Sequence, residues 1–316
     1  NVFLITLTLM VGTAGLPHVI IRFYTVPKAS DARWSAGWAL VFIGLLYTTA
    51  PAVAVFSKYN LLNTLANKPV EEVRQIDWVQ KWEQTGLLKL QDKNGDGILQ
   101  MSANPDVNEV TIDRDIIVLS TPEVAKLSPF IVGLVAAGGL AAALSTAAGL
   151  LIVIASAISH DLYARLINPG ASEATKLLIA RVVIFLVVVL AAPFGINPPA
   201  FIAQLVAFAF GLAASTFFPA ILLGIFDRRM NMQGAVAGMI VGLVFTASYI
   251  IGTKYLGWPN FILGITAEGI GAIGMLLNFV VAYLVSRATP PPPEEIQHLV
   301  DEIRIPKGSA GSALEH

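Results

Sequence analysis

The amino-acid sequence predicts an all-α integral membrane protein. Hydrophobic residues fill 55% of its 316 positions, charged residues fill only 13%, and the mean hydropathy is +0.71. A soluble domain carries about a quarter of its residues as charged side chains, so lipid is the expected solvent. The apolar residues also gather into seven continuous runs, and a helix needs about 20 such residues to cross the hydrocarbon layer.

Continuous apolar runs favour helices over the alternating pattern of a membrane barrel, because every backbone polar group must find a partner inside the bilayer. The predicted spans are Asn1–Ile21, Trp34–Phe56, Ser128–Ser159, Lys176–Ala192, Pro199–Phe226, Met232–Ile251 and Asn260–Ser286. They divide the chain into helices 1–2 (residues 1–56), an insert (57–127), helices 3–7 (128–286) and a tail (287–316). The chain begins inside an apolar run, and we expect it to be the C-terminal portion of a longer protein.

Basic residues predict how the spans are oriented. Seven spans place successive loops on alternating sides, and one side carries most of the lysines and arginines: Arg22, Lys28, Arg33, Arg165, Lys176, Arg228, Arg229 and Arg287. The positive-inside rule assigns that side to the cytoplasm. We therefore expect a multi-pass protein of the cell (inner) membrane with an extracytoplasmic insert and a cytoplasmic C-terminus.

The polar insert is too long to be a simple loop in a compact protein. Within it, Gln75–Leu90 has the pattern of a short amphipathic helix and Val110–Leu119 that of a strand. These elements predict a small folded domain. The tail after Pro290 combines a rigid proline spacer with a short polar helix over Glu294–Ile305.

The formal net charge of −1 gives no reason to expect nucleic-acid binding. The absence of cysteine excludes disulfides, thiolate metal sites and a cysteine nucleophile. The spans carry no cluster of His, Asp and Glu, so we do not expect an enzyme.

Two glycines and a proline interrupt the first span, in the segment Gly12–His18. Proline removes an N–H and clashes with the preceding turn, and transporters use such breaks to line substrate and ion sites. A kink that serves packing alone is the other explanation, and these residues leave both open. His18 follows the break, and an ionisable group at membrane depth is a candidate for a substrate or proton role, although it can also lie near the cytoplasmic interface.

The third span carries two hydroxyls on a helix made mostly of Gly, Ala and Leu, which allows other helices to approach closely. Ala142, Ser145 and Thr146 share one face because they are spaced i, i+3 and i+4. Two hydroxyls and a carbonyl supply about half of the oxygen ligands that a sodium ion needs. Hydroxyls that bond back to the preceding turn are the alternative.

The segment Asp92–Gln100 fits the first half of a calcium-binding EF-hand loop. Oxygen ligands would come from Asp92, Asn94 and Asp96, with the carbonyl of Ile98 at the seventh position. The twelfth position, where a bidentate glutamate belongs, is Ala103. An ion-free Asn-Gly, Asp-Gly turn is the alternative.

Several motifs in order along the chain resemble the sodium/solute symporter family. The matching segments are Gly15–Tyr24, Ala142–Thr146, Ser159–Tyr163, Leu222–Phe226 and Gln233–Gly238. The insert and the segment Ile303–Gly308 are most similar to the branch of cation/acetate (monocarboxylate) permeases.

The resemblance implies a fold of two inverted five-helix repeats, like that of LeuT. This chain would hold the second repeat and two extra helices, and the missing N-terminal helices of the same protein would complete it. The resemblance also implies that Ser145, Thr146 and the Ala142 carbonyl bind sodium. It further implies that Gly15, Leu16 and Pro17 line the cavity for the substrate. We expect His18, next to the break, and Gln204, on the fifth span, to bind the substrate as well.

The function implied is a sodium-coupled symporter that imports a small organic solute, most specifically acetate or another short monocarboxylate. The fifth span lacks the carboxamide-rich face of sugar-transporting relatives, which argues against a sugar. The alternative function is a membrane sensor or scaffold whose transporter-like body anchors a calcium-binding extracytoplasmic domain. The expected ions are Na⁺ and, in the insert, Ca²⁺.

Overall fold

The computed structural model describes residues 1–303 and confirms the predicted all-α membrane fold. Six of its helices are long and apolar enough to cross a membrane, and a bent pair at the N-terminus raises this to up to seven within the described chain. The chain divides into two compact units, Asn1–Tyr24 together with the chain from Val188 onward, and Thr25–Val187. Each unit is described by itself.

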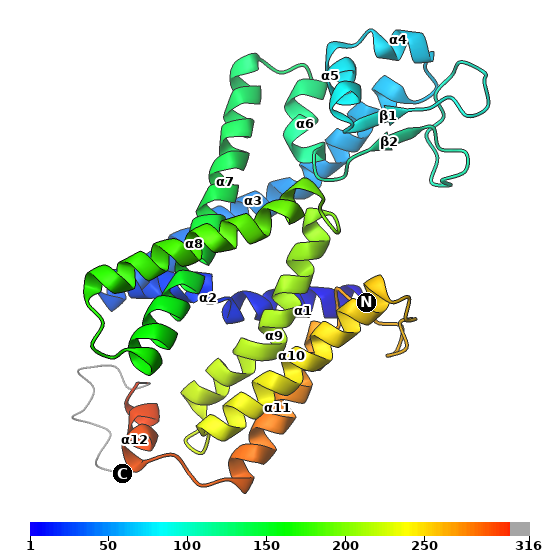
Figure 1. Cartoon of the computed structure of the whole chain (residues 1–316). Helices are drawn as coiled ribbons and strands as arrows, with labels where there is room; N and C mark the ends of the chain where they lie inside the picture. The colour runs from blue at the N-terminus through cyan, green and yellow to red at the C-terminus, as the bar shows by residue number, and fades with distance from the viewer. Residues whose placement is uncertain (304–316) are drawn as a thin grey trace. The chain divides into compact units, whose positions relative to one another are not determined.

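The first unit is a bundle of apolar helices. It contains α1 (Val2–Gly15), α2 (Pro17–Ile20), a 3-10 turn at Ile21–Tyr24, the end of α8 (Glu173–Ile196), α9 (Ile202–Phe226), α10 (Met232–Tyr255), α11 (Gly271–Ala288) and α12 (Glu294–Glu302). Helices α9, α10 and α11 pack side by side, and α1 packs across α9 (Figure 1).

Small residues explain how closely α10 and α11 approach. Gly234, Gly238 and Gly242 recur every four residues along one face of α10. A Cβ at Gly234 would lie 2.7 Å from the Ala282 carbonyl oxygen of α11, so no larger residue fits without moving the helices apart. In a membrane, such contacts replace the hydrophobic effect as the force that holds helices together.

The last span is shorter than predicted, because its helix begins at Gly271 rather than at Asn260. Residues 256–270 form a loop with left-handed backbone at Gly257, Leu263 and Gly264, which a continuous helix cannot contain. The loop is nevertheless ordered by packing. Its Ile265 is buried beside Tyr249, whose hydroxyl donates a hydrogen bond to the Ile265 carbonyl at 2.7 Å.

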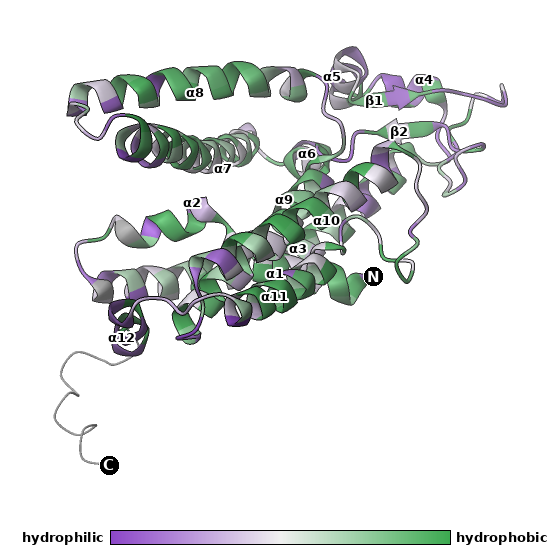
Figure 2. Cartoon of the chain, turned by 60° about the horizontal axis from the view of Figure 1, so that its bottom comes forward, coloured by the Kyte–Doolittle hydropathy of each residue, from purple (hydrophilic) through white to green (hydrophobic). Residues whose placement is uncertain are grey.

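The second unit holds three long apolar helices: α3 (Ala29–Leu65), α7 (Pro129–Ser156), which continues as a π-helix over Ala157–Ile167, and most of α8. Figure 2 shows the hydrophobic colouring of α7 and α8 along most of their length. Almost none of their apolar spans is buried within the chain. Such apolar surface requires lipid or further protein around it.

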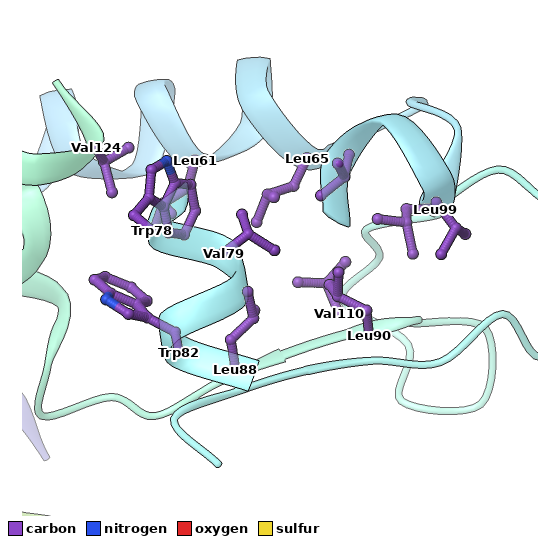
Figure 3. Packing of buried hydrophobic residues seen from close by; sticks show 12 residues of the cluster. Leu61, Leu65, Trp78, Val79, Trp82, Leu88, Leu90, Leu99, Val110 and Val124 are labelled. Carbon is purple, nitrogen blue, oxygen red and sulfur yellow. The ribbon is translucent and has the colours of Figure 1, made fainter. Parts of the chain in front are cut away.

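The insert has a hydrophobic core of its own. It is built from the end of α3, α4 (Val70–Arg74), α5 (Asp77–Thr85), the antiparallel strands β1 (Leu88–Leu90) and β2 (Val110–Ile112), and α6 (Ile117–Val124). Figure 3 shows side chains from α3, α5 and both strands pointing toward one another. Trp78 and Trp82 meet edge to face at 4.9 Å between ring centroids, a favourable aromatic geometry.

Two elements of the insert differ from the prediction. The amphipathic helix expected over Gln75–Leu90 ends at Thr85, because Gly86 adopts a left-handed conformation and Leu88 then enters β1. The strand expected over Val110–Leu119 covers only Val110–Ile112, and the chain is helical again from Ile117. In the tail, α12 ends at Glu302, and the predicted end of this helix at Ile305 lies outside the described residues, as does most of the Ile303–Gly308 segment.

Candidate functional site

The first span is broken at one residue. Helix α1 ends at Gly15, Leu16 is extended (φ −77°, ψ 115°), and α2 restarts at Pro17 with a bend of 51°. Because Pro17 has no N–H and Leu16 has left the helix, carbonyls of the last turn of α1 lose their usual partners. The Leu16 N–H reaches the Thr13 carbonyl at 3.4 Å, whereas the Gly15 carbonyl loses the N–H of Val19, which donates to the Leu16 carbonyl instead.

Two glycines allow the broken segment to pack closely against α9. A Cβ at Gly15 would lie 2.7 Å from the Ala213 carbonyl oxygen and 3.1 Å from the Phe218 nitrogen, and one at Gly12 would overlap the Phe210 carbonyl. Gly15 and Leu16 are buried. The break is thus held by backbone-to-backbone contact with one stretch of α9.

His18 lies on α2, directly after the break. Its Nδ1 is shielded from solvent and has no hydrogen-bond partner within residues 1–303. Buried polar atoms are nearly always paired. This nitrogen is therefore available to a ligand, an ion-bound water or a group outside the described chain.

In the second unit, α7 carries the hydroxyl pair. Ser145 donates a hydrogen bond from its Oγ to the Ala142 carbonyl at 3.2 Å. This is the back-bonding that membrane helices commonly use, and it brings together two of the oxygens that the sequence assigned to sodium. Ala142, Ser145 and Thr146 are all exposed in this chain.

Gln204, in the first turn of α9, forms a polar cluster with Glu268 and Lys254. Its Nε2 donates to Oε1 of Glu268 at 2.5 Å, and the same oxygen pairs with Lys254 Nζ at 3.0 Å. Lys254 also lies 6.0 Å from the centre of the Phe208 ring. This polar triad joins α9, the end of α10 and the loop before α11.

Burial would raise the pKa of Glu268, but the hydrogen bond from Gln204 and the ion pair with Lys254 outweigh it and lower the pKa to about 2. Glu268 is therefore a carboxylate at every physiological pH. Of these three residues, only Gln204 was predicted as a site residue. A signal was present, because Glu268 is the only acidic residue between Met232 and Pro293 and Lys254 is the only basic one before Arg287.

The Asp92–Gly97 loop holds its shape through internal hydrogen bonds. Asp92 accepts from the backbone N–H groups of Gly95 and Gly97, at 2.7 and 2.9 Å, and Asp96 accepts from that of Ile98 at 2.8 Å. The side-chain amide oxygen (Oδ1) of Asn94 accepts from the Asp96 N–H at 3.0 Å. An ion-free turn of this kind accounts for the loop.

Beneath the loop lies Glu109, which is only 2% exposed. Its two oxygens accept the backbone N–H groups of Lys93 at 2.9 Å and of Gln100 at 2.8 Å. No group of three His, Cys, Asp or Glu side chains in the described chain is placed to hold a metal ion. The calcium hypothesis therefore gains no support from the structure.

The comparisons with known proteins point to transport. Residues 101–242 match the sodium:solute symporter family. The chain is 41% identical over 312 residues to an uncharacterized symporter of Cupriavidus necator, covering 96% of this chain and 44% of that protein. It is 31% identical over 252 residues to a monocarboxylic acid transporter of Corynebacterium glutamicum, covering 76% of this chain and 36% of that protein.

The chain has the helices of a multi-pass membrane protein and a broken span of the kind that transporters use to line their sites, and its relatives carry the names of transporters and not of enzymes. The family that the sequence motifs indicated is confirmed: the chain belongs with the sodium:solute symporters. It spans less than half the length of the curated relatives it matches.

Proposed function

We propose that this chain is the C-terminal part of a sodium-coupled symporter that imports a short monocarboxylate, with acetate as the first candidate. The observation that carries the proposal is the break at Leu16. It combines freed backbone, a helix start at Pro17 and the unpartnered Nδ1 of His18 in one place. Pro17 has no N–H, and the N–H groups of Val19 and Ile20 donate to the Leu16 carbonyl, so the backbone N–H and the ring of His18 are the donors that this helix start would offer to a carboxylate.

The substrate class rests on two further points. One relative carries the printed name of a monocarboxylic acid transporter. The face of α9 that contacts the break is apolar and backbone-rich, with Phe210, Ala213 and Phe218 contributing. A small carboxylate needs few side-chain partners, whereas a sugar needs several amides or hydroxyls. In this proposal Gly15, Leu16, Pro17 and His18 line the cavity, with Gln204 at its outer end.

For sodium we propose the Ala142 carbonyl and the Ser145 and Thr146 hydroxyls. The three residues share one exposed face of α7, and sodium would have to replace the hydrogen bond that Ser145 makes to the Ala142 carbonyl. Remaining ligands would come from the part of the protein that precedes this chain. Coupling requires that binding of the ion and of the substrate depend on each other, and rocking of one helix bundle against another in the full-length protein would then alternate access to the substrate.

The proposed membrane arrangement follows the basic residues. The loops that carry Arg22, Arg165 and Arg229 would face the cytoplasm of the cell (inner) membrane, and the insert the opposite side. The C-terminal tail would be cytoplasmic.

Uptake of labelled acetate, pyruvate and glycolate into vesicles that contain the full-length protein tests the function. We expect acetate accumulation when a sodium gradient is imposed and little when potassium replaces sodium. Gly224→Ala is the matched control variant, because a Cβ at Gly224 meets no atom within 4 Å. Uptake driven equally by both cations would contradict sodium coupling, and uptake of none of the three acids would contradict the substrate class.

A further inference from the structure

Helix α9 contains a proline within its apolar span. Pro219 is fully buried, and it has no N–H to donate to the carbonyl of Ser215, four residues earlier. Ser215 is fully buried as well, so water does not reach this carbonyl. An unpaired carbonyl in such a place costs about 1–3 kcal/mol unless another donor replaces the lost N–H.

Asn278 of α11 supplies the donor. Its Nδ2 donates to the Ser215 carbonyl at 2.8 Å and to the Thr216 carbonyl at 2.9 Å. Asn278 is 0% exposed, and its amide is a lone polar group in the middle of an apolar helix. Polar residues inside membrane helices are costly and are usually kept for a specific partner.

Helix α10 is shaped around this contact. A Cβ at Gly242 would overlap the Ser215 carbonyl, and one at Gly238 would lie 2.9 Å from the backbone oxygen of Asn278. Both glycines therefore allow three helices to meet where α9 is interrupted. The carbonyl of Ser215, the amide of Asn278 and the α10 backbone form one packed unit.

The same stretch of α9 carries the break of α1. Gly15 contacts the Ala213 carbonyl and the Phe218 nitrogen, so residues 213–218 meet α1 on one side and Asn278 on another. A shift of this stretch would move the surface on which Leu16 and Pro17 are seated. Tightly packed interiors transmit such shifts.

We propose that Asn278 is a positioning residue for transport: it replaces the hydrogen bond that Pro219 removes from α9 and so fixes the surface that seats the broken first span. The last two helices are then part of the transport machinery and not an accessory. The consequence for transport rests on the proposed function, whereas the hydrogen-bond replacement does not.

A double-mutant cycle in the full-length protein tests the proposal. Asn278→Leu keeps the branching of the side chain but removes the donor, and Pro219→Ala restores an N–H for the Ser215 carbonyl. We expect Asn278→Leu alone to lower the unfolding temperature in detergent and to raise the KM for the transported acid about threefold or more. In the Pro219→Ala background, the same substitution should change both quantities much less.

A smaller effect of Asn278→Leu in the Pro219→Ala background is the decisive result. If Asn278 only filled space, the losses of stability from the two substitutions would add in the double variant. Additive losses of stability would overturn the hydrogen-bond replacement. A coupled loss of stability with an unchanged KM would overturn the positioning role. If Asn278→Leu yields no folded protein, Asn278→Ala takes its place, and folding of the double variant but not of the single one counts as rescue.

The two proposals fail in different ways. If the protein transports no monocarboxylate, the unfolding cycle still decides whether Asn278 replaces the missing bond. If acetate is transported with sodium but the unfolding cycle is additive, the positioning role alone is wrong. Gly224→Ala, on α9 like Pro219 and with no atom within 4 Å of the added Cβ, is expected to change neither the unfolding temperature nor the KM.

Discussion

Substitution of Gly15 by alanine tests most directly how the broken span is held. A Cβ at this position would lie 2.7 Å from the Ala213 carbonyl oxygen, 3.1 Å from the Phe218 nitrogen and 3.2 Å from the Ala213 carbonyl carbon. All three are backbone atoms of α9, so no side chain can rotate away. Gly15 is the last residue of a right-handed helix and has no positive φ, so alanine brings no backbone strain of its own.

The magnitude follows from that geometry. To restore an ordinary contact, α1 and α9 must separate by about 0.7 Å at the break, and overpacking of this kind costs about 1–3 kcal/mol. Such a loss changes the folding equilibrium constant by about 5- to 150-fold. Because this separation would move Leu16 relative to α9, it should also raise the KM for the transported acid.

Equilibrium unfolding of the full-length protein in mixed detergent micelles measures the loss, and vesicle uptake measures the KM. Gly224→Ala is again the control, because the added methyl meets nothing within 4 Å and removal of a glycine from a helix is neutral or slightly stabilising. If Gly15→Ala were as stable as Gly224→Ala and had the same KM, the backbone contact between α1 and α9 would not hold the break.

Three further predictions concern polar groups. Glu268→Gln should destabilise the protein at pH 7 by up to about 3 kcal/mol. Because the folded-state pKa of about 2 lies below the ordinary 4.5, the stabilisation by the Glu268 carboxylate is present above pH 4.5 and is lost as the pH falls toward 2. Curves of stability against pH that run parallel for wild type and variant would refute this prediction. Glu109→Ala should lower the free energy of unfolding by about 2–5 kcal/mol, since the part-buried N–H groups of Lys93 and Gln100 lose a charged acceptor. The control is Glu123→Ala, which removes only an exposed pair with Lys81 and should change the free energy of unfolding by less than about 1 kcal/mol. Millimolar calcium should leave the unfolding temperature unchanged, because internal hydrogen bonds account for the Asp92–Gly97 loop, and a clear rise in that temperature would reinstate the calcium site.

The sequence predicted the fold class because the strongest signal in a membrane protein is the length of its apolar runs. The bend at Leu16 lies within the segment that the glycines and proline marked, since proline acts locally on the helix that contains it. Boundaries were less predictable. The last span was predicted to begin at Asn260 but begins at Gly271, because the loop of residues 256–270 is itself apolar and buries Ile265 and Ala267.

Contacts between distant positions could not be predicted from a single sequence. The pairing of Gln204 with Glu268 joins residues 64 apart, and that of Asn278 with Ser215 joins residues 63 apart. Composition can mark Glu268 and Asn278 as unusual polar groups among apolar residues, but it cannot name their partners. Only the packing of α9, α10 and α11 brings these atoms together.

In the insert, too, the sequence predicted an element but neither its end nor its distant contacts. The amphipathic pattern around Trp78 and Trp82 predicted a helix that is present, but not that Gly86 ends it and sends Leu88 into a strand. Glu109 carries no sequence signal, because its role depends on backbone N–H groups of a loop that precedes it by about 15 residues. Local propensity finds elements, and tertiary contacts decide where they end.

The sodium site is tested by the dependence of the unfolding temperature on sodium, measured for the purified full-length protein in NaCl and in KCl at equal ionic strength. A ligand that binds only the folded state stabilises it by RT ln(1 + [L]/Kd). We expect sodium to raise the unfolding temperature of the wild type above its value in potassium, and the Ser145→Ala, Thr146→Ala double variant to lose that difference. An equal sodium-specific rise in the double variant would contradict sodium binding by these hydroxyls.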